Sequence, residues 1–95
     1  MFAFPEEASW NDAEQSVEFA VELGPYRGKV FVPLRVFHAL LGRNPTPEQC
    51  IACFHLSRTN FERAAEARLH ARALDEDANI RLTGRDLRQS SGIRT

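Results

Sequence analysis

The stretch TPEQCIACFHLSRTNFERAAEARLHARAL, residues 46–74, decides how this chain of 95 residues folds. Thr46 suits a helix N-cap, Pro47 suits the first helical position, and Gln49 has the spacing of a capping box with Thr46. Apolar side chains then recur at steps of three and four residues, as on one face of a helix: Cys50, Ile51, Phe54, Phe61, Ala64, Ala65 and Leu69. The spacing predicts an amphipathic helix from Pro47 to about Leu74.

One internal signal argues for a break in this helix. Thr59 and Glu62 have the spacing of a second capping box, which would divide the helix near Ser57. No glycine or proline interrupts residues 48–77, so one continuous helix is the preferred interpretation.

A continuous helix would be longer than the rest of the domain. About 28 residues make a helix of roughly 40 Å, whereas a compact domain of this size has a radius of gyration of about 12 Å. Arg68 and Arg72 fall on the apolar stripe near its far end, where a compact core would not admit unpaired charges. That end is expected to overhang. It then contacts either the acidic N-terminal segment or a second copy, and the second alternative gives a homodimer.

Strands are predicted before this helix. Apolar and polar residues alternate from Ser16 to Leu23, which places one face in the core and the other in water. Residues 29–32 supply the returning strand, and the glycines between the two predict a hairpin with a longer loop. Residues 2–4 predict a short first strand, followed by a polar loop that contains Trp10, Asn11 and Asp12.

Two further helical segments and a last strand complete the prediction. Pro33 opens a short helix that runs to Leu41 and is closed by Gly42, with an apolar face formed by Leu34, Phe37, Leu40 and Leu41. Residues 79–82 predict the last strand, and Thr83 caps a terminal turn. The fold class is α+β: a small, mostly antiparallel sheet, made of the N-terminal hairpin and a C-terminal strand, covered by one short and one long helix.

Composition sets the class of protein. With 43% hydrophobic and 26% charged residues, the chain is typical of an ordinary globular protein, and residues 1–95 are expected to form a single domain with residues 90–95 frayed. Neither a signal peptide nor a run of about 20 apolar residues is present. The expected location is the cytoplasm, with no membrane partner.

The net charge is −1, and the charged residues are unevenly distributed along the chain. Residues 1–26 contain acidic side chains but no lysine or arginine. Residues 27–45 contain lysine and arginine but no acidic side chain. Pairing between these segments within the chain is the preferred interpretation. The alternative is a basic surface for RNA or the ribosome, formed by Arg35, Arg43, Arg81, Arg85 and Arg88.

Arg58 is the first candidate binding residue. It falls within the apolar stripe between Phe54 and Phe61, and a buried guanidinium requires a carboxylate or several carbonyl acceptors. A structural ion pair with Glu62 or Asp86 is the preferred interpretation. The functional alternative is a site for an anion or a partner, formed by Arg58 with His55.

The two cysteines, Cys50 and Cys53, form a CxxC motif near a helix N-terminus, where thiols can support redox or metal chemistry. Cys50 lies on the apolar stripe about four positions into the helix, and the second ligand pair of a zinc site is missing. Two reduced thiols packed as small apolar groups are the preferred interpretation.

Short motifs give the chain a family resemblance over residues 2–87. They are Phe4-Pro5, Trp10 with Asp12, Val17-x-Phe19, Leu40 with Gly42, Phe54-x-x-x-Arg58 with Ala65, and Ile80-x-Leu82-Thr83-x-x-Asp86. With these motifs the chain resembles a family of small bacterial proteins, the domain-of-unknown-function family 1488. Pro33 departs from the family, where a small polar cap is expected. The resemblance implies a fold and carries over no activity.

No nucleophile with a neighbouring base and no phosphate-binding glycine loop is found. The expected function is therefore a small accessory or protein-interaction module that is not an enzyme and uses no cofactor. Its expected partner is another protein or a second copy of the chain. An RNA- or ribosome-associated protein is the second hypothesis, and a weak thiol-redox or metal site at Cys50 and Cys53 is the third.

Overall fold

Two long strands form the centre of a mixed sheet in the computed structural model, which describes residues 2–90. Strand β3, Ser16–Leu23, pairs antiparallel with β4, Tyr26–Pro33, along their whole length. The alternation of β3 is the one predicted, because Val17, Phe19 and Val21 are buried on one face.

The hairpin loop is shorter than predicted. Leu23 pairs with Tyr26, so the loop consists only of Gly24 and Pro25. Gly24 has a φ of 58°, the left-handed value that a two-residue hairpin requires at its first loop position. The returning strand therefore begins at Tyr26.

Both edges of the sheet are short strands. Strands β1, Phe2–Ala3, and β2, Ala8–Asn11, pair one after the other with the same side of β3. Trp10 and Asn11 thus lie in a strand, and the predicted polar loop is limited to residues 12–15. On the other edge β5, Ile80–Arg81, pairs with β4 in parallel. Within residues 2–90 these strands form one mostly antiparallel sheet with a C-terminal strand, as predicted.

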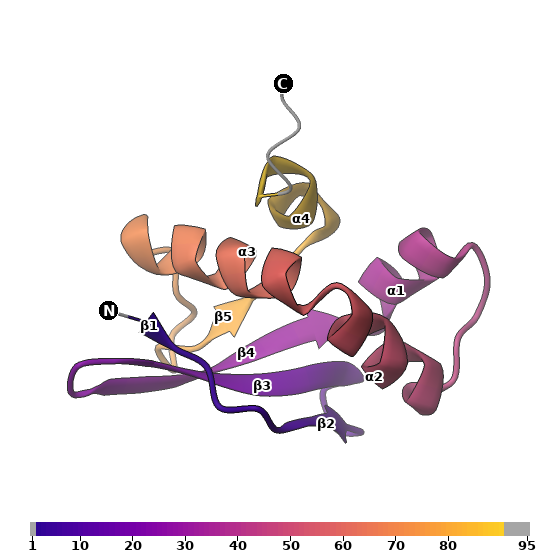
Figure 1. The fold of residues 1–95 in the computed structure, drawn as a ribbon, viewed down its shortest axis with the longest axis horizontal. Coiled ribbons are helices and arrows are strands. Elements are labelled where there is room, and N and C mark those ends of the chain that lie inside the picture. The colour runs from indigo at the N-terminus through magenta and orange to yellow at the C-terminus, as the bar shows by residue number, and fades with distance from the viewer. Residues whose placement is uncertain (1, 91–95) are drawn as a thin grey trace.

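The helices lie on one side of the sheet (Figure 1). They are α1, Leu34–Leu41, α2, Pro47–Leu56, α3, Arg58–His70, and α4, Gly84–Ser90. The predicted capping box is present at the start of α2. The Gln49 backbone amide donates to Thr46 Oγ1 at 3.2 Å, and the Thr46 backbone amide donates to Gln49 Oε1 at 2.9 Å. None of the helices among residues 2–90 has the length and hydrophobicity of a membrane span.

The continuous long helix was the wrong interpretation, because Ser57 separates α2 from α3. Ser57 has φ −117° and ψ 26°, and its side chain caps neither helix. Phe54 and Phe61, on either side of the break, are both buried with ring centroids 5.4 Å apart. Both aromatic residues thus belong to one core, on either side of the break.

The predicted overhang is also absent, since α3 ends at His70 and packs against α4. Arg68 is paired, because its Nη2 and Nε donate to Asp86 Oδ2 at 2.9 and 3.1 Å. The Cα radius of gyration is 12.6 Å, as expected for a compact chain of this length. Ser90 is the last residue of α4, and the predicted fraying concerns residues that otherwise lie outside the described range.

The short helix buries only part of the predicted apolar face, and it buries Val36 in addition. Val36 and Phe37 of α1 are buried, and Leu34 packs at the edge of the core. Leu40 and Leu41 remain 53% and 40% exposed. The predicted C-cap at Gly42 is present, with a φ of 74°.

Candidate functional site

The outer face of the sheet carries the segregated charges predicted from the sequence, and it pairs them internally. Glu22 Oε2 lies 3.4 Å from Arg27 Nε, and Glu18 Oε2 lies 3.8 Å from Lys29 Nζ. In both pairs the acid lies on β3 and the base on β4. The antiparallel hairpin therefore pairs two acids of the acidic segment with two bases of the basic segment across neighbouring strands.

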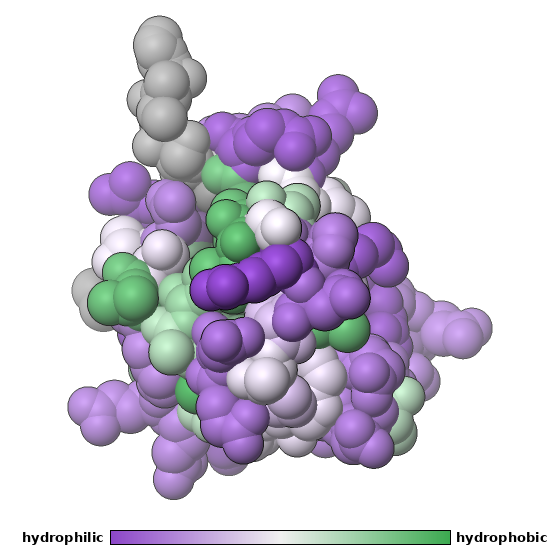
Figure 2. Space-filling model, turned by 90° about the vertical axis from the view of Figure 1, so that its right-hand side faces the viewer, coloured by the Kyte–Doolittle hydropathy of each residue, from purple (hydrophilic) through white to green (hydrophobic). Residues whose placement is uncertain are grey.

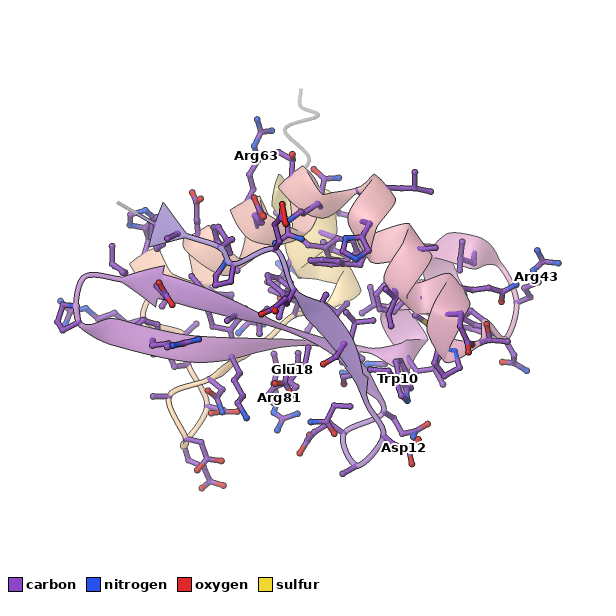
Figure 3. All side chains as sticks on the ribbon, turned by 60° about the horizontal axis from the view of Figure 1, so that its bottom comes forward. Trp10, Asp12, Glu18, Arg43, Arg63 and Arg81 are labelled. Carbon is purple, nitrogen blue, oxygen red and sulfur yellow. The ribbon has the colours of Figure 1, made fainter. Side chains whose placement is uncertain are left out.

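Arg81 belongs to the same charged face (Figure 3). Its guanidinium lies 4.9 Å from the centre of the Phe31 ring, donates to Glu14 at 2.7 Å and donates to Asp75 at 3.2 Å. The pKa of Asp75 is lowered, first by the hydrogen bond from the Asn79 backbone amide and then by those from the Asp77 backbone amide and Arg81. Arg81 thus covers an aromatic ring and ties the segment before β5 to the β2–β3 loop.

The arginines proposed as one basic surface do not form one surface. Arg81 lies on the outer face of the sheet, whereas Arg43 lies at the end of the molecule formed by α1 and α2 (Figure 3). Arg35 is exposed on α1, and Arg85 and Arg88 are exposed on α4. The structure therefore removes Arg81 from the set and leaves four arginines on the helical side.

Arg58 is held by groups of the chain itself. Its Nε donates to Glu62 at 2.7 Å, Nη1 donates to the Glu6 carbonyl at 2.8 Å, and Nη2 donates to the Pro5 carbonyl at 2.5 Å. These carbonyls belong to residues 4–7, which separate β1 from β2. Arg58 therefore anchors the interruption in the edge strand, through the carbonyl acceptors that a half-buried guanidinium requires.

His55 does not join Arg58 in a common pocket. The His55 ring packs edge-on against Phe54, with centroids 5.3 Å apart, and it is exposed. The Arg58 guanidinium lies over the same Phe54 ring, 5.2 Å from its centre. The two candidate residues thus share an aromatic neighbour. All three guanidinium nitrogens of Arg58 donate to Glu62 or to the backbone carbonyls of residues 5 and 6.

The two thiols differ in burial. Cys50 is fully buried and Cys53 is half-buried, and neither forms a disulfide. Burial raises the pKa of both thiols, and the neighbouring Cys53 raises that of Cys50 further. Raised pKa values disfavour the thiolate that redox and metal chemistry require. Within residues 2–90, no group of three or more His, Cys, Asp or Glu side chains could hold a metal ion.

Three leucines form what we call the leucine face: Leu40 and Leu41 at the end of α1 and Leu56 at the end of α2. Leu56 is 88% exposed. Two hollows adjoin this face: one of about 330 Å³ between α1 and α4, and one of about 320 Å³ between the end of α1 and α2. Figure 2 looks onto this end of the molecule and shows apolar surface broken up by hydrophilic side chains.

The sequence held a signal for Leu56. Successive residues of a helix are about 100° apart, so Leu56 lies on nearly the opposite side from the buried Phe54, two positions earlier. A leucine opposite a buried aromatic residue is expected to face solvent. Leu40 and Leu41 carried no such signal, because helical periodicity placed them with Phe37.

Comparisons with known proteins agree on one family. The family described as "Protein of unknown function (DUF1488)" matches residues 3–82. No curated protein matches the chain. A crystal structure of a protein of unknown function from the DUF1488 family of Shewanella loihica PV-4 is similar, with a TM-score of 0.78 and 20% sequence identity. The similarity covers 85% of this chain and 90% of that one.

Proposed function

The chain belongs to the DUF1488 family, which is described as a family of unknown function, and from this premise we propose that it is a small bacterial protein-interaction module and not an enzyme. Its proposed location is the cytoplasm, which two free cysteines support. Its proposed binding surface is the leucine face.

The observation that carries this proposal is the exposure of three large apolar side chains on neighbouring helices. Leu41 and Leu56 line the same hollow, and Leu40 lines the other. Burial of apolar surface contributes about 25 cal/mol per Å², so a partner that covers these leucines gains free energy at each of them. The hollows offer space for side chains of a partner.

A non-enzymatic role is supported by how the charged groups are used. Arg58 binds backbone carbonyls and Glu62, Arg81 binds Glu14 and Asp75, and Arg68 binds Asp86. Each of these groups stabilises the fold by connecting two of its elements.

The test is affinity capture of the tagged chain from a lysate of its own host, followed by mass spectrometry. A parallel sample treated with nuclease separates protein partners from material bound through RNA. We expect Leu56→Ser and Leu40→Ser to lose the wild-type partners. Ala67→Ser, on the exposed side of α3, is the matched control and should retain them. Identical capture by the leucine variants and the wild type would refute a binding role for this face.

A second copy of the chain is the second candidate partner. One stripe of α2 lines the second hollow and consists of Gln49, Ala52, Cys53 and Leu56. Leu56, at the end of this stripe, also protrudes into solvent. A twofold interface requires the same patch to carry both a protruding group and its recess, as this stripe does. Sedimentation velocity over a range of concentrations tests it: a wild-type dimer that Leu56→Ser dissociates supports it, and a monomer at high concentration refutes it.

A further inference from the structure

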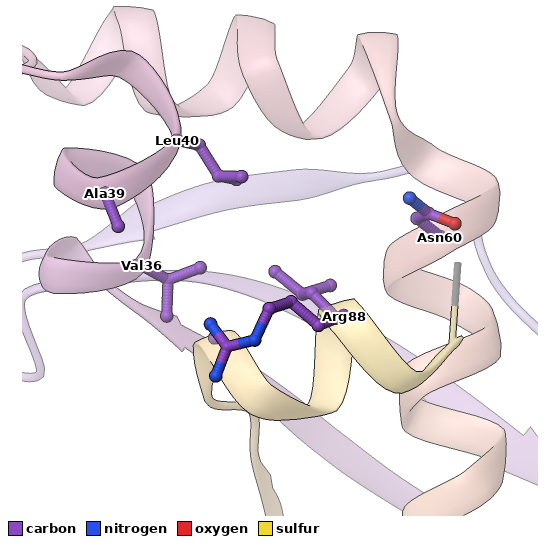
Figure 4. A pocket seen from close by; sticks show the side chains of 7 residues that line it. Val36, Ala39, Leu40, Asn60 and Arg88 are labelled. Atoms are coloured by element: carbon purple, nitrogen blue, oxygen red, sulfur yellow. The ribbon is translucent and has the colours of Figure 1, made fainter. Parts of the chain in front are cut away.

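The hollow between α1 and α4 has an apolar floor and a basic rim. Its lining consists of Val36, Ala39, Leu40, Asn60, Gly84, Leu87 and Arg88. Figure 4 shows Arg88 reaching from α4 along this hollow toward α1. A Cβ atom added at Gly84 would lie 3.4 Å from Arg88 Nη1, so the guanidinium extends back over the start of α4.

The second hollow has the same character. Its lining consists of Leu41, Arg43, Gln49, Ala52, Cys53, Leu56 and Ser57. Each hollow thus combines apolar side chains with a single charged residue, and in both that residue is an arginine. Leu40 and Leu41 are consecutive, so the two hollows lie on either side of the last turn of α1.

The surroundings of the hollows add positive charge. Residues 27–45, which contain α1 and the start of the link to α2, include no aspartate or glutamate. Asp86, the acid of α4, is already bonded to Arg68 and to Thr83. Arg35 and Arg85 are exposed on the same two helices as the first hollow. Beside the second hollow, Glu48 lies in the first turn of α2. The two hollows and their helices thus carry more arginines than acids, so a ligand at this end meets apolar recesses with an excess of positive charge.

We infer that the leucine face binds an acidic amphipathic helix of a partner protein. Apolar side chains of that helix enter the two hollows, and its carboxylates contact Arg43 and Arg88. An apolar groove with a charged rim is the usual docking site for such a helix, which presents apolar anchors at i, i+3, i+4 and i+7. The inference rests on the proposed function and specifies the chemistry of the partner.

The test uses the whole chain, labelled with ¹⁵N, and two synthetic helical peptides as probes. The peptides share one length and one leucine spacing, and carry either glutamate or lysine at the other positions. We expect the glutamate peptide to shift amide resonances of α1, α4 and the end of α2, and to bind more weakly as salt concentration rises. The lysine peptide should bind far more weakly.

Charge reversal separates specific contacts from overall attraction. Arg43→Glu and Arg88→Glu should each weaken binding of the glutamate peptide by about three- to fivefold beyond the effect of a control, the range of an exposed ion pair. Arg63→Glu is the matched control, because Arg63 is exposed on α3 and lines neither hollow. Leu40→Ser should weaken binding by about tenfold, since it removes an apolar contact.

Three results would overturn the inference: equal binding of both peptides, resonance shifts confined to other surfaces, or no binding of either peptide. Each is distinct from failure of the proposed function, which the leucine variants test by capture. If the leucine variants lose their partners in capture but neither peptide binds, the interaction module stands and the acidic helix is refuted. A wild-type dimer that either leucine variant dissociates would assign the face to a second copy instead.

Discussion

At the scale of single residues, Gly28 shows how one position on β4 is restricted by a neighbouring side chain. A Cβ atom at Gly28 would collide with the hydroxyl end of the Tyr26 ring, which lies across it. Tyr26 Oη donates to the Ala78 carbonyl at 2.8 Å and so holds the segment between α3 and β5 against the sheet. We expect Gly28→Ala to lower the free energy of unfolding by about 1–3 kcal/mol, the cost of forced repacking, measured by urea denaturation.

Tyr26→Phe is the matched variant, because it keeps the ring and removes only the hydroxyl. It should cost about 0.5–1.5 kcal/mol, the net contribution of one hydrogen bond. If Gly28→Ala were as stable as the wild type, Tyr26 would not restrict this position.

Arg58 supports a second prediction at this scale. Arg58→Met removes the donors to the Pro5 and Glu6 carbonyls and leaves Glu62 without its partner. We expect a loss of about 1–3 kcal/mol in the free energy of unfolding and faster amide exchange in β1. Arg58→Lys should rescue little of this loss, because a lysine cannot reproduce the guanidinium fork.

The Arg58 prediction has a matched control and an outcome that would contradict it. Arg63→Met on the exposed side of α3 is the control and should change stability by less than about 0.5 kcal/mol. An Arg58→Met variant that keeps its stability but loses a partner in the capture experiment would show that Arg58 binds that partner.

At the scale of elements, the two helix starts have different causes. Thr46 caps α2 by side-chain and backbone hydrogen bonds, whereas the Ser57 side chain makes none at the start of α3. Thr46→Ala should therefore cost about 1 kcal/mol, and Ser57→Ala should stay within about 0.5 kcal/mol. Urea denaturation of both variants measures the difference. A Ser57→Ala loss as large as that of Thr46→Ala would show that a local cap causes the break.

Local patterns predicted the elements more successfully than their contacts. The cap at Thr46, the alternation of β3 and the end of α1 at Gly42 depend on residues a few positions apart, and all three are present. The break at Ser57 was only the less favoured alternative. Its proposed cap, Thr59 with Glu62, is not the cause, because α3 begins at Arg58 with Ser57 at its N-cap and Thr59 already lies inside the helix.

At the scale of the whole molecule, the packing of α4 on α3 predicts a dependence of stability on pH. Burial raises the pKa of Asp86, but the hydrogen bonds from Arg68 and Thr83 outweigh burial, and the net pKa lies below its ordinary value of 3.8. A carboxylate whose pKa is lowered by folding stabilises the protein fully above its ordinary pKa. This contribution is lost as the pH falls below 3.8 and through the lower pKa of the folded state.

The measurement is the free energy of unfolding of the wild type and Asp86→Asn between pH 2 and pH 7. Asp86→Asn should cost about 1–2 kcal/mol at pH 7, because it weakens charge-assisted hydrogen bonds. The difference between the two proteins should shrink as the pH falls below about 4. A difference that is constant with pH would show that ionised Asp86 does not stabilise the contact between α3 and α4.

The candidate sites were less predictable than the fold. The sequence identified Arg58 as a residue that needs partners and named Glu62 as one of them, but the carbonyls of residues 5 and 6 are more than 50 positions away and carry no sequence signal. Leu40 and Leu41 were expected in the core. They are exposed, and the contact of α1 with the core consists of Val36 and Phe37, with Leu34 at its edge.

The sequence by itself determined the α+β class, the hairpin, the start of α2 and the family, because alternation, capping and turn formation act between residues close along the chain. Only the tertiary structure decided the break at Ser57, the pairing of Arg68 with Asp86 and the exposure of Leu40 and Leu41. These features depend on which surfaces remain uncovered once distant segments have packed. That outcome follows from the shape of the whole core, and no local pattern of residues contains it.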